Sequence, residues 1–143
     1  MRLKEQSKHA APSPRGFSLP KSQILRGRTN FKSLFSNSKF ISTPSITLRY
    51  TLSSHPTGDL QMAFISPKKI GTAVARNRTR RLLREAFRLN KELLVPSGGN
   101  IPAIQLHGAC IARKSPLTFA AVQQDMETLL INLRTRVAAY STT

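Results

Sequence analysis

The chain has 143 residues, of which 39% are hydrophobic, and this suits a single domain with one modest core. Its 23 lysine and arginine residues face only six acids, giving a formal net charge of +17. Such a charge destabilises the compact chain by self-repulsion, so we expect a polyanionic partner, either nucleic acid or an anionic membrane surface. No apolar run approaches the roughly 20 residues of a membrane helix, and the pattern of a secretory signal is missing. We therefore expect an intracellular, cytoplasmic protein.

The acids and histidines are scattered along the sequence. They are Glu5, Asp59, Glu85, Glu92, Asp125 and Glu127, with His9, His55 and His107. Metal-dependent hydrolysis by a protein needs several convergent carboxylates, and no histidine here has a partner at metal-ligand spacing. His55 is typical of a turn and His107 of a strand edge. We expect no catalytic and no metal-binding residue, and we expect the single cysteine, Cys110, to be a buried hydrophobe.

The N-terminal part of the sequence changes character near residue 18. Residues 1–18 mix basic residues, serine and proline without periodicity, which predicts a disordered basic arm. A cleaved organellar transit segment is an alternative. Further along, Phe31 and Phe35 lie four residues apart and predict a short helix, with Thr29 or Asn30 as its N-cap.

Strands follow this helix. A short one is predicted at 40–42, and a half-buried one at 46–52, where apolar and polar residues alternate. A turn rich in Ser, Pro, Gly and Asp at 53–59 leads to a returning strand at 60–66. The last two strands are expected to pair as an antiparallel hairpin.

A long helix is predicted from Thr72 or Ala73 to about Leu94, where Pro96 and two glycines end it. One face is expected to pack on a sheet, and its residues are Thr79, Leu82, Leu83, Ala86, Phe87 and Leu89. A narrower stripe on the other side consists of Asn77, Arg80, Arg81, Arg84 and Arg88. One side of this helix should therefore be core, and the other should present guanidinium groups in a row.

The rest of the chain predicts a Pro/Gly-rich loop at 95–104, a strand at 108–114 and a final helix. Ser115 is the expected N-cap of that helix, Pro116 lies in its first turn, and residues 139–143 should fray. The order is helix, three strands, helix, strand, helix. It indicates an α+β fold in which helices cover one sheet.

The arginine stripe calls for an anionic partner. Arginines at neighbouring helical positions repel one another, and the lone Glu85 cannot offset them. Phosphates opposite the stripe remove this repulsion, because arginine binds phosphate bidentately. A solvated basic face without a partner is the simpler alternative, although such faces usually mix both signs. The rings of Phe31, Phe35 and Tyr50 flank the basic block and could stack on bases of single-stranded RNA, but spacing alone favours core positions for them.

The basic block and its flanks carry a family pattern. Its elements are Lys68-Lys69-Ile70-Gly71, Ala73-Val74, Arg76-Asn77-Arg78, Arg80-Arg81, Leu83-Arg84-Glu85-Ala86-Phe87-Arg88, Leu48-Arg49-Tyr50 and Ile111-Ala112-Arg113-Lys114. This pattern resembles the bacterial ribonuclease P protein subunit. The resemblance covers about Leu19 to Val137, nearly everything outside the N-terminal arm.

The resemblance implies a domain at 19–138 with a two-layer α/β sandwich like the second domain of ribosomal protein S5, including a left-handed β-α-β crossover. It implies one chain bound to a catalytic RNA, which removes the 5′ leader of precursor tRNA using Mg²⁺ held mainly by the RNA. The residues implied to bind that RNA are Lys68, Lys69, Arg76, Asn77, Arg78, Arg80, Arg81, Arg84 and Arg88. A central cleft with Phe31, Phe35 and Tyr50 would hold the single-stranded leader.

Three alternatives remain open on the sequence. The chain could be another RNA-binding protein, such as a ribosomal component with a similar basic helix. It could carry an amphipathic helix that lies on a membrane surface. A DNA-binding regulator is the third, although no helix-turn-helix spacing is present and strands flank the basic helix.

Overall fold

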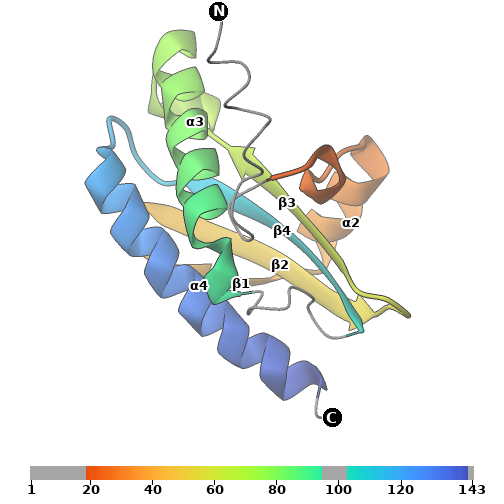
Figure 1. Cartoon of the computed structure of the whole chain (residues 1–143). Helices are drawn as coiled ribbons and strands as arrows, with labels where there is room; N and C mark the ends of the chain where they lie inside the picture. Colours follow the sequence, from red (N-terminus) through yellow and green to blue (C-terminus); the bar gives the residue numbers. More distant parts are fainter. Residues whose placement is uncertain (1–18, 95–102, 142–143) are drawn as a thin grey trace, which may run out of the picture.

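The computed structural model describes residues 19–94 and 103–141 (Figure 1). The predicted arm at 1–18 and most of the predicted loop at 95–104 lie outside the described residues. With η for a 3-10 helix, the elements are η1 (Lys21–Gln23), α2 (Arg28–Ser36), β1 (Lys39–Ser42), β2 (Ile46–Ser54), β3 (Asp59–Ile65), η2 (Lys68–Ile70), α3 (Ala73–Asn90), η3 (Lys91–Leu93), β4 (Ile104–Ala112) and α4 (Phe119–Ser141). This confirms the predicted order of helices and strands, and α4 extends into the tail that was expected to fray.

The four strands form one sheet in the order β1-β2-β4-β3. β1 and β4 each pair antiparallel with β2, whereas β3 pairs parallel with β4. The expected hairpin between 46–52 and 60–66 is therefore wrong, because β4 lies between these strands. β4 suits this central place because it is apolar on both sides, with Gly108, Ala109 and Cys110 all buried. It also begins at Ile104, before the predicted start at 108.

The connection β3–α3–β4 joins two parallel neighbouring strands and is left-handed (Figure 1). Nearly all such connections in proteins are right-handed, so this hand is a distinctive feature of the fold. Because β3 is at the edge of the sheet, one side of α3 lies beside that edge. The crossover thus places the charged side of α3 next to the part of β3 around Phe64 and Ile65.

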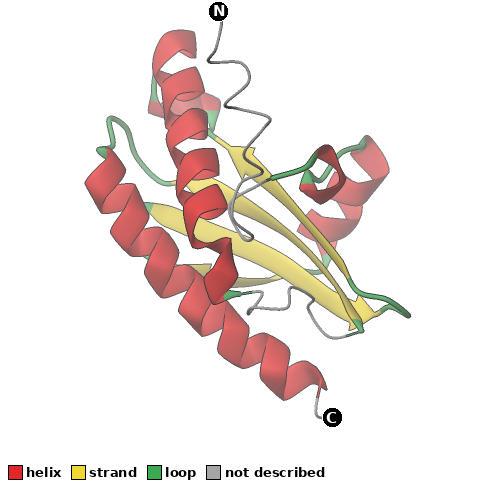
Figure 2. Cartoon of the chain, viewed as in Figure 1, coloured by secondary structure: helices red, strands yellow, loops and turns green. Residues whose placement is uncertain are grey.

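The main core lies between the sheet and helices α3 and α4, which cover one face (Figure 2). Alternate residues of β2, including Leu48 and Tyr50, point into it and share it with Phe87 of α3 and Leu130 of α4. Full burial of an apolar side chain of this size contributes about 1.5–3 kcal/mol. This core holds α3 firmly against the sheet, so the direction of its outer side is fixed.

The opposite face of the sheet carries the short helix α2 (Figure 2). Leu34 of α2 is 1% exposed and packs in a small cluster with Leu25, Ala63 and Ala109. Alanines at these strand positions allow α2 to approach the sheet closely. Helices therefore lie on both faces, and α2 covers only part of its own.

α3 begins at Ala73, within the predicted range, and Thr72 is its N-cap. The hydroxyl oxygen of Thr72 accepts a hydrogen bond from the backbone N–H of Ala75 at 3.2 Å. The helix ends at Asn90, whose side-chain amide donates to the carbonyl of Ala86 at 2.8 Å. A 3-10 turn continues to Leu93, close to the predicted end.

The start of α2 differs from the prediction. Neither Thr29 nor Asn30 is the N-cap; that position is held by Gly27, with a φ of 95° that favours glycine. Asn30 donates instead to the carbonyl of Arg26 at 2.7 Å. The helix thus begins at Arg28, and its N-cap lies two residues before Thr29, the earlier of the two candidates.

The start of α4 also differs. The predicted cap at Ser115 is wrong, since the helix begins at Phe119. The hydroxyl of Thr118 accepts from the N–H of Ala121 at 3.2 Å and caps the helix there. Serine and threonine are both good N-caps, but only Ser115 was considered from the sequence, and Pro116, expected in the first turn, precedes the helix.

Candidate nucleic-acid interface

The outer side of α3 presents the charged stripe that the sequence predicted. Leu83 and Phe87 are fully buried against the sheet, whereas Arg81 and Arg84 are exposed. We use the name arginine face for the basic block of η2 and α3, which comprises Lys68, Lys69, Arg76, Asn77, Arg78, Arg80, Arg81, Arg84 and Arg88. These residues do not all share one side of α3, because Asn77, Arg80, Arg81 and Arg84 line one groove, whereas Arg78 lines a separate hollow with Ser115.

One arginine of this face is paired. Nη2 of Arg88 lies 2.6 Å from Oε2 of Glu85, and this hydrogen bond lowers the pKa of Glu85 and raises the pKa of Arg88. At the other end, Nη1 of Arg76 donates to the carbonyl of Gly71 at 3.1 Å. These contacts orient two side chains without cancelling the charge of the others.

The remaining arginines have few contacts within the protein. Nη2 of Arg80 donates to Oδ1 of Asn77. In the part of the chain that the structure describes, Arg78, Arg81 and Arg84 have neither a hydrogen-bond nor an ion-pair partner. Their guanidinium groups are therefore free to bind phosphates, each through two parallel N–H donors.

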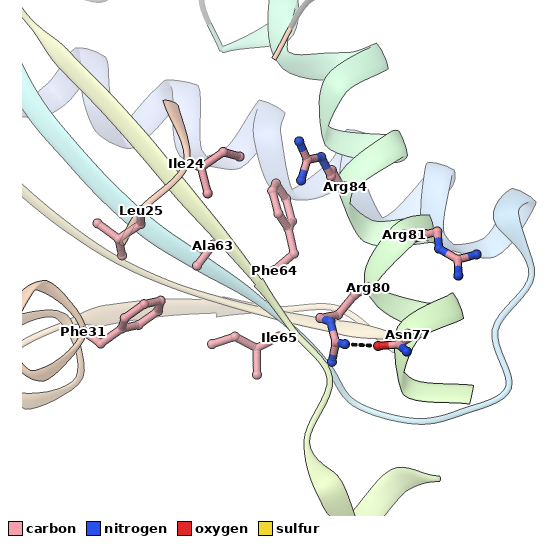
Figure 3. A pocket seen from close by; sticks show the side chains of 10 residues that line it. All are labelled: Ile24, Leu25, Phe31, Ala63, Phe64, Ile65, Asn77, Arg80, Arg81 and Arg84. Carbon is pink, nitrogen blue, oxygen red and sulfur yellow. Dashed lines mark hydrogen bonds between the residues drawn. The ribbon is translucent and has the colours of Figure 1, made fainter. Parts of the chain in front are cut away.

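A groove of about 390 Å³ runs beside this face (Figure 3). Its lining residues are Ile24, Leu25, Phe31, Ala63, Phe64, Ile65, Asn77, Arg80, Arg81 and Arg84. The β3 residues form an apolar floor, Phe31 of α2 lies on one side, and the α3 arginines lie on the other (Figure 3). A groove with one apolar, aromatic side and one cationic side matches a nucleotide strand, which has bases on one side and phosphates on the other.

Two of the three predicted aromatic residues lie together on α2. The rings of Phe31 and Phe35 are stacked, with centroids 6.3 Å apart and planes inclined by 13°. Phe31 is half-buried and Phe35 is exposed. Phe31 lines the groove, so an unpaired base in the groove could stack on its ring, whereas the guanidinium of Arg49 lies over Phe35.

The third ring, Tyr50, is not brought to this groove. It is 1% exposed, and its hydroxyl oxygen accepts a hydrogen bond from Nη1 of Arg136 at 2.9 Å. The expected grouping with Phe31 and Phe35 is wrong, because alternation along β2 turns Tyr50 towards α4. Its neighbour Arg49 points to the α2 side instead.

Several groove residues were not singled out from the sequence. Ile24 and Leu25 precede α2, and the backbone N–H of Leu25 donates to the carbonyl of Met62 on the β3 edge at 3.0 Å. This contact places the segment before α2 beside the edge strand. Its apolar character was visible in the sequence, but its position on β3 was not.

Two acids of the described residues, Asp59 and Asp125, are held by distant parts of the chain. Oδ2 of Asp59 lies 2.8 Å from Nε2 of His107, and Oδ2 of Asp125 accepts from the backbone N–H of Ser45 at 3.0 Å. Among residues 19–94 and 103–141, no group of three or more His, Cys, Asp or Glu side chains could hold a metal ion. His107 lies within β4, paired on both sides, and not at a strand edge as expected.

Cys110 is fully buried, as predicted, and this burial raises the pKa of its thiol to about 12. The thiol is therefore protonated at neutral pH. The sulfur acts as a packing atom in the main core.

The membrane-surface alternative is not supported by the position of α3. Its apolar residues Leu83, Ala86 and Phe87 are 0% exposed, so they are unavailable to a lipid interface. None of the helices in the described ranges has the length and apolarity needed to cross a membrane.

Comparison with known proteins identifies the family. Residues 19–134 match the family model Ribonuclease P. The chain belongs to the ribonuclease P family. A ribonuclease P protein component from Syntrophus aciditrophicus is 30% identical over 99 residues, covering 64% of this chain and 82% of that relative. One from Desulfatibacillum aliphaticivorans is 34% identical over 107 residues, covering 74% and 86%, and one from Porphyromonas gingivalis is 37% identical over 84 residues, covering 57% and 61%.

Solved ribonuclease P proteins share the fold. The protein from Thermotoga maritima superposes with a TM-score of 0.59 at 23% identity, covering 76% of this chain and 96% of that one. The protein from Staphylococcus aureus gives a TM-score of 0.58 at 20% identity, covering 80% and 97%. The four-stranded sheet with its crossover helix is thus the fold of the family.

Proposed function

We propose that this chain is the protein component of ribonuclease P, which binds the catalytic RNA and the 5′ leader of precursor tRNA and assists removal of that leader. The observation that carries this proposal is the arginine face held rigidly beside a groove with an aromatic wall. Membership of the family supports ribonuclease P RNA and precursor tRNA as the partners. The geometry supports one surface for each, the arginine face for the RNA subunit and the groove for the leader.

The arginine face is proposed to bind the RNA subunit. Its residues, from Lys68 to Arg88, include only one carboxylate, that of Glu85, which is bound to Arg88. Each phosphate that they neutralise releases condensed counterions, so affinity should fall steeply as salt rises. Rigid packing of α3 lowers the cost of ordering these side chains on binding.

The groove is proposed to hold the leader of precursor tRNA. Phe31 and Phe35 offer stacking surfaces, and Arg80 and Arg84 lie opposite Phe31. Stacking of a base on an aromatic ring contributes roughly 1–3 kcal/mol and tolerates every base. Such a site favours unpaired leader nucleotides over a duplex, whose bases are already stacked.

The cleavage chemistry is assigned to the RNA subunit. Among the described residues, the carboxylates of Asp59, Asp125 and Glu85 are bound to His107, Ser45 and Arg88, and no three acids, histidines or cysteines gather, so a protein-borne Mg²⁺ site does not fit them. Mg²⁺ held by the RNA would supply the activated water for hydrolysis that leaves a 5′-phosphate. The chain's own residues bind and position the two RNAs, with one chain per RNA subunit.

Reconstitution tests this proposal. A ribonuclease P RNA, a precursor tRNA and the purified chain are combined at low Mg²⁺, and the 5′ end of the tRNA product is mapped. We expect cleavage at the mature 5′ end that requires the RNA and is strongly stimulated by the chain. No stimulation, or cleavage by the chain alone, would contradict the proposed function.

A further inference from the structure

A second hollow lies beside the start of α3, where the connection between β4 and α4 passes the first turns of this helix (Figure 1). We call it the Val74 hollow. Its volume is about 250 Å³, and its apolar lining residues are Val74, Ala75, Leu82, Pro116 and Leu117. It shares no lining residue with the groove beside Phe31. The first half of α3 therefore borders two separate recesses.

The connection that forms one wall of the hollow is held in place where it begins. The backbone N–H of Arg113 donates to the carbonyl of Ser45 at 2.9 Å, and its Nη1 donates to the carbonyl of Thr43 at 2.7 Å. Oδ2 of Asp125 on α4 accepts in turn from the N–H of Ser45 at 3.0 Å. Because these bonds fix the wall in advance, little ordering is needed when a ligand enters.

The apolar surface of the hollow is open to a partner. Val74 is 79% exposed, although it lies in the first turn of a helix, where valine is a weak helix former. Leu82 is half-buried, and Leu117 is 6% exposed. Single exposed apolar residues are common on protein surfaces, but here several line one recess together. Apolar surface gathered in this way indicates a site for a partner.

The rim of the hollow is cationic. Arg78 lines it and has neither a hydrogen-bond nor an ion-pair partner within the described residues, and Lys114 is exposed next to Ser115. The segments 66–84 and 103–118, which supply both walls, contain no acid. The occupant that this charge favours is anionic outside the recess and apolar within it.

Ser115 adds a polar group to the apolar lining. It is half-buried, and its hydroxyl has no hydrogen-bond partner in the part of the chain that the structure describes. A hydroxyl can both donate to and accept from the edge of a base. The volume of about 250 Å³ is below the roughly 300–1,000 Å³ of pockets for drug-sized ligands, so the hollow suits a single ring system.

We propose that the Val74 hollow binds one unstacked base of the RNA subunit, while Arg78 and Lys114 bind the phosphates beside it. This inference rests on the proposed function, and it adds a base contact and the β4–α4 connection to an interface otherwise made by the cations of η2 and α3. Unpaired bases in loops and bulges of folded RNA are those that proteins bind in apolar pockets and through their edges. The leader is not the occupant, because it is proposed to lie in the other recess.

Binding of the full chain to a ribonuclease P RNA, without precursor tRNA, provides the test. Val74→Ser removes apolar surface but no charge. We expect the affinity to fall about tenfold while the slope of log K against log salt stays parental, because no phosphate contact is lost. Arg78→Gln should instead lower the affinity and the slope together. Ile131→Ser removes an exposed apolar side chain from α4 and, as the matched control, should change neither.

Base modification of the RNA identifies the occupant. Sparsely modified RNA is bound to the parent chain and to Val74→Ser, and the modified positions in each bound fraction are mapped. We expect an unpaired nucleotide whose modification weakens binding of the parent but not of the variant. An abasic residue at that nucleotide should reproduce the tenfold loss with the parent and add no further loss with the variant. Val74→Ala, which favours the helix, should give a smaller loss in the same direction if serine disturbs α3.

Three results would overturn the proposal. One is parental affinity for both Val74 variants. Another is a loss of affinity with a lower salt slope, which would reveal a lost phosphate contact. The third is the absence of any nucleotide whose modification acts through Val74. A parent chain that does not prefer the ribonuclease P RNA to a folded competitor RNA would instead contradict the proposed function itself.

Discussion

Replacement of Arg81 by alanine separates RNA binding from folding. Arg81 is exposed on α3, and within the described residues it has no hydrogen-bond or ion-pair partner, so the change removes no internal contact. Alanine is a good helix former, and the change also relieves repulsion among neighbouring arginines. We expect the free energy of unfolding to stay within about 0.5 kcal/mol of the parent value. Loss of one phosphate contact should reduce the slope of log K against log salt by roughly 0.7–0.9.

The assay is equilibrium binding to a ribonuclease P RNA over a range of salt concentrations, with thermal unfolding of the free protein measured in parallel. Arg134→Ala is the matched control, since Arg134 is exposed on α4, away from the arginine face. Its slope should equal that of the parent. A parental slope for Arg81→Ala would refute a phosphate contact, and a large loss of stability would refute the statement that this side chain has no structural role.

Three further predictions follow from the groove and the core. Phe31→Leu should retain most of the packing of this half-buried residue but lower the affinity for precursor tRNA more than for mature tRNA, and equal losses would argue against leader stacking. Gly108→Ala would place a Cβ atom 3.0 Å from Sδ of Met62 and 3.2 Å from the carbonyl oxygen of Arg49, so thermal unfolding should show a loss of about 1–3 kcal/mol, and an unchanged melting temperature would contradict this packing. Cys110, with a pKa of about 12 and no exposure, should react with thiol reagents only after denaturant is added, whereas rapid alkylation of the native protein would show that the β4 region opens.

The charged helix was predictable because its information is local. The spacing of Leu83, Ala86 and Phe87 defines one face, and a helical period then places Arg81 and Arg84 on the other. The start of this helix at Thr72 or Ala73 was likewise predicted from nearby residues. No knowledge of distant residues was needed for either feature.

The arrangement of the strands was not predictable in this way. A turn between 46–52 and 60–66 indicates two strands running in opposite directions, which is correct, but it does not exclude a third strand between them. β4 takes that place from a distant part of the sequence. β2 and β3 both pair with β4 because β4 is buried on both faces and takes the central position. The local sequence pattern of a strand gives little information about such a position.

The sequence also did not predict which face of β2 lies towards α2. Alternation separates Arg49 from Tyr50, but it does not state which of the two faces carries α2. The sequence analysis placed Tyr50 beside Phe31, whereas the β2 side chain that lies near α2 is that of Arg49. Only the packing of Leu34 on the sheet decides this choice.

The most direct test of the account is the preference of the chain for its proposed RNA. Arg78, Arg81 and Arg84 are replaced together by glutamine, and binding to a ribonuclease P RNA is measured in the presence of an excess of a folded competitor RNA of similar size. The account predicts that the parent chain retains its preference, whereas the variant loses it, with a salt slope lower by roughly 2–3 and a parental melting temperature. A folded variant that binds the ribonuclease P RNA as tightly and as selectively as the parent would contradict the central claim.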